Sequence, residues 1–316
     1  MTSRGRTEQC RDRLIGSYQD RLLFEYVFEA SLARELAPRP YFHPVRTLGG
    51  VTLTDHQPSD HRWHLGLAYS WPVVDEWNLW GGPTFVRDRG YVDLDNRGQI
   101  RHLSWIGHHE QLEWLDKHGS RIATEHRLIG EPEVDAAAGA WWLELDSVIE
   151  TTCEHGLRIG SPTTEGRPLA GYAGLAWRGP MELRDARVIF EDPQPRAASS
   201  AGNLAKPASS GGSEGKGAAG EVAMGHRSRW LGYVAAGMTL GFFEHSANPG
   251  VPNRWFVRTE EYPLVTSSPV FDTELRLVPG AQLRLRHRVL FADGEWNAAR
   301  LSEAASAFER AAHHPS

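Results

Sequence analysis

The sequence predicts an all-β protein: one large antiparallel β-sandwich that carries a helix at its C-terminal end. Two observations predict this class. Short runs rich in branched and aromatic residues recur along the chain with glycine, proline and aspartate between them, and helical patterns are few. A sandwich of roughly 200–250 residues commonly folds as one unit, so a chain of 316 residues does not require two domains. We expect a single domain over residues 14–312.

Strand-like segments follow one another along most of the chain. In chain order they are residues 22–28, 64–71, 121–129, 141–149, 187–190, 230–235, 238–243, 255–258 and 283–291. The fourth segment alternates most clearly, because Trp141, Leu143 and Leu145 mark one face of it. That alternation is lost at Ser147, which the apolar pair Val148–Ile149 follows.

Two segments have helical signals. Residues 31–35 can form one turn before Pro38. Residues 295–312 are the better candidate, because they are rich in alanine and their apolar residues fall near helical spacing. These apolar residues are Trp296, Ala299, Leu301, Ala304, Ala305 and Phe308. We expect this terminal helix to dock on the sandwich.

Residues 193–221 differ from the rest of the chain. They are rich in Ser, Gly, Ala, Pro and Lys and have almost no large apolar residue. Such a segment cannot bury enough surface to order itself. We expect a disordered surface insertion between two strands; a domain linker is the alternative, but the strands that follow look too few to form an independent core.

The overall charge limits the class of partner. The chain has 34 Lys and Arg against 40 Asp and Glu, a formal net charge of −6, which disfavours nucleic acid and anionic membranes as partners. No apolar run approaches the roughly 18 residues of a membrane span, and no apolar signal-peptide segment follows the N-terminal arginines. We therefore expect a cytoplasmic protein in which Cys10 and Cys153 are reduced.

The densest polar cluster lies between residues 43 and 64. Its ionisable members are His43, Asp55, His56, Asp60, His61, Arg62 and His64. Imidazole and carboxylate groups ligate divalent metals and transfer protons. His61 and His64 would face opposite sides of a strand but can converge in a loop, and Pro58 indicates a loop that leads into the strand at His64. Asp60, His61 and His64 are therefore candidate ligands of a divalent metal; equally, Asp60 can simply hold the loop while the histidines bond to backbone.

A second polar set is less informative. It comprises His108, His109, Glu110, His118, Glu125 and His126. Glu125 and Arg127 fall on one face of their strand, opposite His126. We expect a solvated strand face and polar loops for all members of this set except Glu125.

Three cationic residues and a histidine stand near predicted strand ends. Arg167 and Arg178 lie in glycine-containing stretches and can hold a carboxylate or a sugar hydroxyl. His245 ends an apolar strand before an Asn-Pro turn, which would let it face a pocket, and Trp255 and Arg258 lie in the next strand. The sequence contains no phosphate-binding glycine loop and no nucleophile elbow.

Several motifs together resemble one protein family. They are residues 39–44, 60–66, 171–178, 255–258 and 277–289. The chain resembles, from about Leu22 to Gly294, the PmoA-like family of soluble bacterial proteins that are often labelled methane oxygenase PmoA. The resemblance implies a galactose-mutarotase-like supersandwich and a link to sugar catabolism. Trp63 stands where the first of two adjacent family histidines would fall and Arg62 replaces a proline, so the family motif carries over only at Asp60, His61 and His64.

The leading hypothesis is a carbohydrate-active protein that binds a sugar or sugar derivative on the concave face of the sandwich and acts as an acid–base enzyme of isomerase, hydrolase or lyase type. The expected catalytic residues are His61, His64 and His245. The expected substrate-binding residues are His43, Asp60, Arg167, Arg178, Trp255 and Arg258. The alternatives are a metal-dependent oxidoreductase or oxygenase, as the family label suggests, and a sugar-binding module without catalysis.

Overall fold

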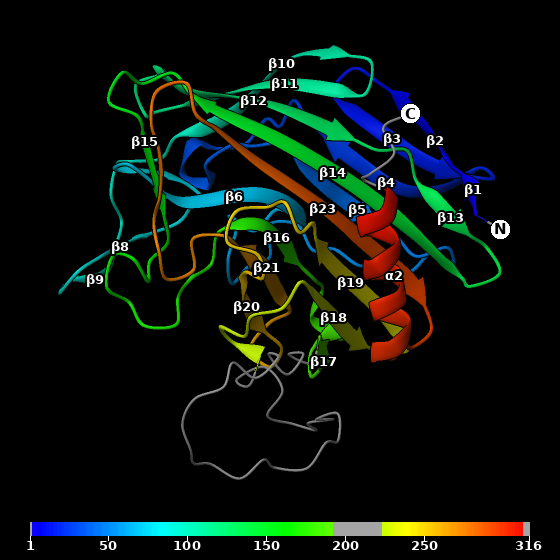
Figure 1. The fold of residues 1–316 in the computed structure, drawn as a ribbon. Coiled ribbons are helices and arrows are strands. Elements are labelled where there is room, and N and C mark those ends of the chain that lie inside the picture. Colours follow the sequence, from blue (N-terminus) through cyan, green and yellow to red (C-terminus); the bar gives the residue numbers. More distant parts are fainter. Residues whose placement is uncertain (1, 192–222, 312–316) are drawn as a thin grey trace, which may run out of the picture.

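The computed structural model describes residues 2–191 and 223–311. Two large antiparallel sheets face each other as a sandwich, and one helix lies at the C-terminal end (Figure 1). The all-β sandwich with a C-terminal helix is therefore confirmed. The insertion expected at residues 193–221 lies outside the described residues.

The first sheet has ten strands among the described residues. Its hydrogen-bonded order is β10 (Gln99–Ile106), β11 (His109–Leu115), β12 (Arg121–Ile129), β14 (Ala140–Thr151), β23 (Gln282–Asp293), β19 (Met238–Glu244), β18 (Trp230–Ala235) and β17 (Arg187–Phe190). Two short strands complete it, since β13 (Glu133–Asp135) pairs with β14 and β1 (Ser3–Arg4) pairs with β13. β1 precedes residue 14, so the sandwich begins earlier in the chain than the expected domain boundary.

The second sheet has eleven strands in the described part of the chain. Its main order is β2 (Arg6–Gln9), β3 (Arg13–Tyr18), β4 (Arg21–Val27), β5 (Tyr41–Val45), β6 (Leu67–Val74), β16 (Gly174–Arg178), β21 (Leu264–Ser268) and β20 (Arg254–Arg258). The side strands are β7 (Trp77–Leu79), β15 (Leu157–Gly160) and β22 (Leu275–Leu277). Outside both sheets lie the hairpin of β8 (Thr84–Val86) and β9 (Gly90–Val92) and the single turns η1 (Arg34–Leu36) and η2 (Met181–Leu183).

The long strand β14 shows how alternation builds the core. Trp141, Leu143 and Leu145 are fully buried between the sheets, as the sequence predicts. The same inward face continues through Ser147, which is also fully buried. Ser147 Oγ donates a hydrogen bond of 2.7 Å to the buried Glu125, so a polar residue in an apolar position is satisfied by a polar partner from the neighbouring strand β12.

Glu125, the member that we excepted from the solvated strand face, is buried together with Arg127. Both side chains point into the sandwich and are buried. Arg127 Nε donates to Glu125 Oε1 (2.8 Å), and Arg127 Nη1 donates to the Tyr26 hydroxyl of the other sheet (2.7 Å). Tyr26 in turn donates to Glu110, which is fully buried and not in a polar loop (2.5 Å). The charges can face inward because each one has a charged or hydrogen-bonding partner there.

A second polar cluster joins the two sheets. The Tyr69 hydroxyl lies 2.9 Å from His287 Nδ1, and His287 Nε2 lies 3.0 Å from Ser267 Oγ. Ser267 donates to Glu244, which also accepts a hydrogen bond from Asn253 Nδ2 (3.1 Å). Burial raises the pKa of Glu244 to about 7, although the hydrogen bonds from Ser267 and Asn253 oppose the rise. The interior therefore holds a carboxyl group that titrates near neutral pH.

Glu244→Gln is expected to change how stability depends on pH. The folded state binds the Glu244 proton more tightly than the unfolded chain does, so the group contributes stability at pH 4.5 that is lost as the pH rises through about 7. At about 1.4 kcal/mol per pKa unit, the wild type should lose roughly 3 kcal/mol relative to the variant between pH of about 4.5 and about 8. Urea denaturation of both proteins across that range measures the difference; a difference that does not change with pH would contradict the prediction.

The C-terminal helix α2 (Ala298–Ala311) confirms the helix expected over residues 295–312 as far as the structure describes it. It begins after Asn297, whose side-chain oxygen accepts a hydrogen bond of 3.0 Å from the Arg300 backbone N–H. Leu301 and Phe308 pack on the outer face of the first sheet, over β18 and β19 (Figure 1). In the described ranges, no helix has the length and apolarity needed to cross a membrane.

Candidate active site

A pocket of about 400 Å³ is lined by residues of the second sheet and by Tyr91 of the β8–β9 hairpin. Its lining residues are mostly aromatic or cationic: His61, Trp63, His64, Trp80, Gly81, Pro83, Tyr91, Arg167, Tyr172, Phe256, Arg258, Glu261, Tyr262 and Leu264. Along β20, Trp255 and Val257 belong to the main core, so Phe256 and Arg258 face the opposite way, towards the pocket. The pocket therefore lies on the face of this sheet that is turned away from the other sheet.

His61 and His64 are brought together by two successive turns. The His61 backbone N–H donates to Pro58 O (3.1 Å), and the His64 backbone N–H donates to His61 O (2.9 Å). The strand expected from His64 begins only at Leu67, so the two histidines are not on opposite faces of a strand. Their rings stack with centroids 4.8 Å apart and planes at 4°, at the edge of the pocket.

Asp60 orients the first imidazole. Its carboxylate accepts two hydrogen bonds of 3.0 Å from the guanidinium of Arg178, and its Oδ2 lies 3.0 Å from His61 Nδ1. Partial burial alone would raise the pKa of Asp60, but the hydrogen bonds from Arg178 and His61 lower it to about 2. An ionised carboxylate only accepts, so His61 Nδ1 carries the proton. His61 Nε2 then has its lone pair available to a ligand.

The second imidazole has the opposite tautomer. Arg178 Nη1 lies 3.2 Å from His64 Nδ1, and because a guanidinium only donates, Nδ1 must accept. Burial, followed by the nearby positive charges of His61 and Arg178, holds the pKa of His64 well below its usual value, so this ring is neutral. His64 Nε2 therefore carries the proton. Arg178 thus makes one histidine a base and the other a hydrogen-bond donor.

The same contacts decide the question of a metal site. Within residues 2–191 and 223–311, no group of three or more His, Cys, Asp or Glu side chains could hold a metal ion. The expected ligands Asp60, His61 and His64 lie side by side, but both Asp60 oxygens and His64 Nδ1 are directed at Arg178. The Arg178 guanidinium therefore occupies these atoms, and a metal ion would have to displace it in order to bind Asp60 and His64 through them.

Two arginines expected to bind substrate line the pocket. Arg167 stacks on the Tyr91 ring, with its guanidinium carbon 4.7 Å from the ring centroid, and donates a hydrogen bond to the Tyr91 hydroxyl. The Tyr91 hydroxyl also lies 2.9 Å from that of Tyr172, so these three side chains form one wall. Arg258 Nη1 lies 3.6 Å from Glu261 Oε2, and both residues belong to the same lining.

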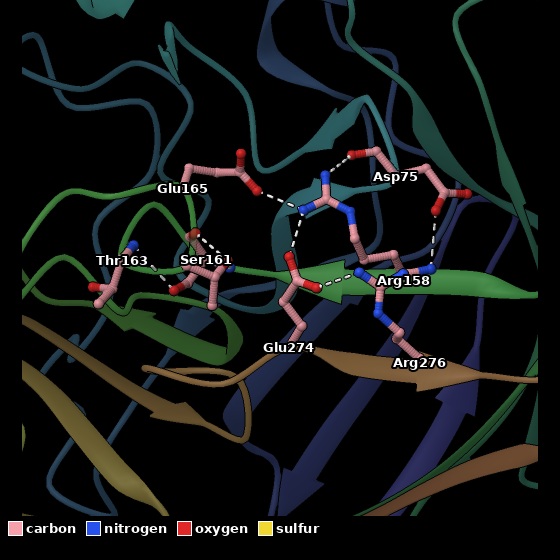
Figure 2. A network of polar contacts seen from close by, with 8 residues as sticks. Asp75, Arg158, Ser161, Thr163, Glu165, Glu274 and Arg276 are labelled. Atoms are coloured by element: carbon pink, nitrogen blue, oxygen red, sulfur yellow. Dashed lines mark hydrogen bonds and ion pairs between the residues drawn. The ribbon is translucent and has the colours of Figure 1, made fainter. Parts of the chain in front are cut away.

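Arg158 anchors the loop that carries Arg167 (Figure 2). Arg158 Nη1 donates to Glu165 (2.6 Å) and to Glu274 (2.7 Å), and its Nη2 donates to the carbonyl oxygen of Asp75 (2.7 Å). One guanidinium thus ties the loop after β15 to two other segments of the chain. The network positions Arg167 and is itself formed by mutually paired charges, so it offers no open cation or anion site.

The structure does not bring the remaining expected residues to this pocket. His43 Nδ1 bonds to Thr54 Oγ1 (3.0 Å) away from the lining residues. His245 is buried against Phe308 of α2, and its Nδ1 accepts a hydrogen bond from a backbone N–H. Trp255 is fully buried in the core, and its indole N–H donates to the Ser228 carbonyl (2.9 Å).

Several lining residues were not predicted from the sequence. They are Trp63, Trp80, Tyr172 and Tyr262. Trp63 precedes His64 in the polar cluster, and Tyr172 follows Gly171 in a glycine-containing stretch. Their positions beside candidate site residues could have identified them as lining residues. Trp80 and Tyr262 are isolated aromatics in loops, and nothing in their local sequence distinguishes them from core residues.

A family model described as "Family of unknown function (DUF6807)" matches residues 16–306 of the chain. No curated protein matches the chain. The match corrects the resemblance to the PmoA-like family, because the matching family has no known function and nothing in it indicates a PmoA-like protein. The motifs behind that resemblance are short strand and turn segments, whose residue types recur among β-sandwiches. The implied galactose-mutarotase-like fold and the link to sugar catabolism lose that support.

Proposed function

Since the chain belongs to a family of unknown function, which its residues 16–306 match, we propose a function from the pocket itself. The protein binds a sugar or sugar derivative and acts on it by acid–base chemistry. The observation that carries the proposal is the stacked pair His61 and His64, held in opposite tautomers by Asp60 and Arg178 beside aromatic walls. A base and a hydrogen-bond donor in one pocket are the pair that proton transfer needs.

The walls suit a sugar ring. Trp80, Tyr172 and Tyr262 supply apolar ring faces, and the pocket of about 400 Å³ falls in the size range of roughly 300–1,000 Å³ that is usual for small-molecule sites. Aromatic faces pack on the C–H faces of sugars, while arginine and histidine N–H groups donate to hydroxyl oxygens.

The roles follow from the tautomers. His61 Nε2 would take a proton from a C–H or O–H group of the bound sugar, because Asp60 orients the ring and stabilises the imidazolium that forms. His64 Nε2–H would donate a hydrogen bond to the oxygen on which negative charge develops. Isomerisation, elimination and hydrolysis all use such a pair.

The test is a panel of mono- and oligosaccharides and keto-sugars, with binding and turnover measured for the wild type, His61→Ala and the control His126→Ala. His126 is an exposed histidine on β12, outside the pocket lining. We expect His61→Ala to retain binding and to lose about 10²–10⁴-fold in turnover, the usual contribution of a general base. Binding without turnover in the wild type would indicate a sugar-binding module, and no saccharide-dependent signal in any protein would refute the proposal.

The cytoplasmic residence expected from the sequence is part of this proposal. Cys10 and Cys153 are free thiols in the structure, and free thiols persist in reducing compartments. The net charge of −6 supports a small-molecule ligand over nucleic acid or an anionic membrane.

A further inference from the structure

The charges around the pocket are unbalanced. Arg167 and Arg258 line it, and two further arginines contact lining residues from behind: Arg178 bonds to His64, and Arg39 donates to the Trp63 carbonyl. In the lining itself two guanidinium groups, Arg167 and Arg258, face one carboxylate, Glu261. Behind it Arg178 is paired with Asp60, whereas Arg39 has no carboxylate partner among the described residues. The charged lining is therefore more cationic than the chain as a whole, whose formal net charge is −6.

Arg39 is the most unusual of the four. It is only 2% exposed, and in the described ranges it forms no ion pair with a carboxylate. Its Nε donates to Ser70 Oγ (2.8 Å), and its Nη2 donates to the Trp63 carbonyl (2.8 Å). Burial lowers the pKa of Arg39 to about 9, so the group stays charged at neutral pH. A buried cation without a counter-ion costs several kcal/mol. Placed behind the pocket, it favours an anion there.

Arg167 has donors to spare. Its described contacts are the stacking on Tyr91 and one hydrogen bond to the Tyr91 hydroxyl, and none involves a carboxylate. A guanidinium has five N–H donors, so most of its donors are available to a ligand.

Arg258 is only weakly neutralised. Its partner Glu261 is 66% exposed, and an exposed pair at 3.6 Å contributes little because water screens it. Arg258 Nε is buried and has no hydrogen-bond partner in the part of the chain that the structure describes. Buried donors are almost always paired in folded proteins, so the described protein groups leave this guanidinium incompletely satisfied.

We propose that the ligand of this pocket is a sugar acid, whose carboxylate is bound by Arg167 and Arg258 while its ring lies against the aromatic walls. This inference rests on the proposed function. A carboxylate is planar and fits the fork of N–H donors that each guanidinium presents. A sugar phosphate shares the negative charge but carries a tetrahedral group, so the two anions can be separated by experiment.

Calorimetric titrations with matched ligands test the proposal. The probes are glucuronate and galacturonate, the neutral sugars glucose and galactose, and glucose 6-phosphate. We expect each uronate to bind roughly 10–100-fold more tightly than its neutral counterpart, as charge-assisted hydrogen bonds imply. That preference should shrink as salt is added, since salt screens the attraction between exposed charges.

Two variants and a control locate the effect. Arg167→Met and Arg258→Met should each remove most of the uronate preference, so that each variant binds a uronate and its neutral counterpart with affinities within about tenfold of each other, while methionine keeps the apolar length of the side chain. Arg21→Met, at an exposed arginine of β4 outside the pocket lining, should keep the full preference. Thermal melts of all three variants check that they remain folded.

The possible results distinguish a failure of the sugar-acid proposal from a failure of the proposed function. Equal or tighter binding of neutral sugars would overturn the sugar-acid proposal and leave the sugar pocket standing. Tighter binding of glucose 6-phosphate than of either uronate would also overturn it, in favour of a phosphorylated sugar. No binding of any of these sugars would refute the proposed function itself, and the sugar-acid inference with it.

Discussion

Replacing Arg127 with methionine is expected to lower the free energy of unfolding by about 3–5 kcal/mol, the usual cost of removing one partner from a buried ion pair. Arg127 is 1% exposed and bonds to Glu125 and to the Tyr26 hydroxyl. Its guanidinium carbon also lies 5.0 Å from the centroid of the Tyr69 ring. Without it, Glu125 would remain buried with no positive charge to balance it, and the nearby Glu110 would keep only its contact with His102 (2.9 Å).

Urea denaturation measures the effect, with Arg284→Met as the matched control. Arg284 pairs with Asp146 at 2.5 Å, but its side chain is 58% exposed, so its loss should cost about 1 kcal/mol or less. The destabilisation by Arg127→Met should also shrink at acid pH. Burial already raises the pKa of Glu110, and loss of Arg127 would raise it further, so protonation would relieve the unpaired charge. Equal costs for the two substitutions would contradict the buried-pair argument.

Replacing Arg178 with methionine is expected to abolish the function of the pocket at a modest cost in stability. Arg178 holds Asp60 with two hydrogen bonds, sets the tautomer of His64, and lies 4.6 Å from the centroid of the Tyr262 ring. Its loss would release Asp60 and with it the orientation of His61. We expect sugar turnover to fall by about 10²-fold or more, in line with other misoriented catalytic groups. Asp60 is 40% exposed and can regain water, so the free energy of unfolding should fall by only about 1–2 kcal/mol.

Nuclear magnetic resonance of the imidazole nitrogens gives a readout that stability does not affect. In the wild type, His64 should stay neutral and protonated on Nε2. In the variant, the pKa of His64 should rise, because one nearby positive charge is gone while the larger effect of burial remains. The control is Arg184→Met, at an exposed neighbour of η2. An unchanged tautomer and unchanged turnover in Arg178→Met would contradict the role given to this arginine.

Regular local patterns were read correctly from the sequence. The strand expected at residues 121–129 is β12 with the same bounds, and the helix expected at residues 295–312 is α2 with a start three residues later. Strand alternation and helical periodicity are properties of neighbouring residues, so they are visible without any knowledge of tertiary contacts. The later helix start reflects the cap at Asn297, which the apolar pattern does not reveal.

Polar residues inside strands were misread for a physical reason. Arg127 looks solvated in sequence, because the partner that allows it to be buried, Tyr26, lies 101 residues away. Ser147 likewise appears to break a pattern that in fact continues, since Glu125 satisfies it across the sheet. Whether a charge can be buried depends on its partner, and the local sequence does not contain that partner.

The sequence by itself determined the sandwich class, the terminal helix and a loop at Asp60 and His61 that leads to His64. Only the tertiary structure decided what that loop does. Arg178 reaches Asp60 across 118 residues and sets both tautomers, while Arg167 and Arg258 arrive from other segments to line the same pocket. The tertiary structure also places Trp255 in the core and His245 against Phe308 of α2. Local patterns determine which backbone forms, but the electrostatics of a site depends on distances between segments that only the fold brings together.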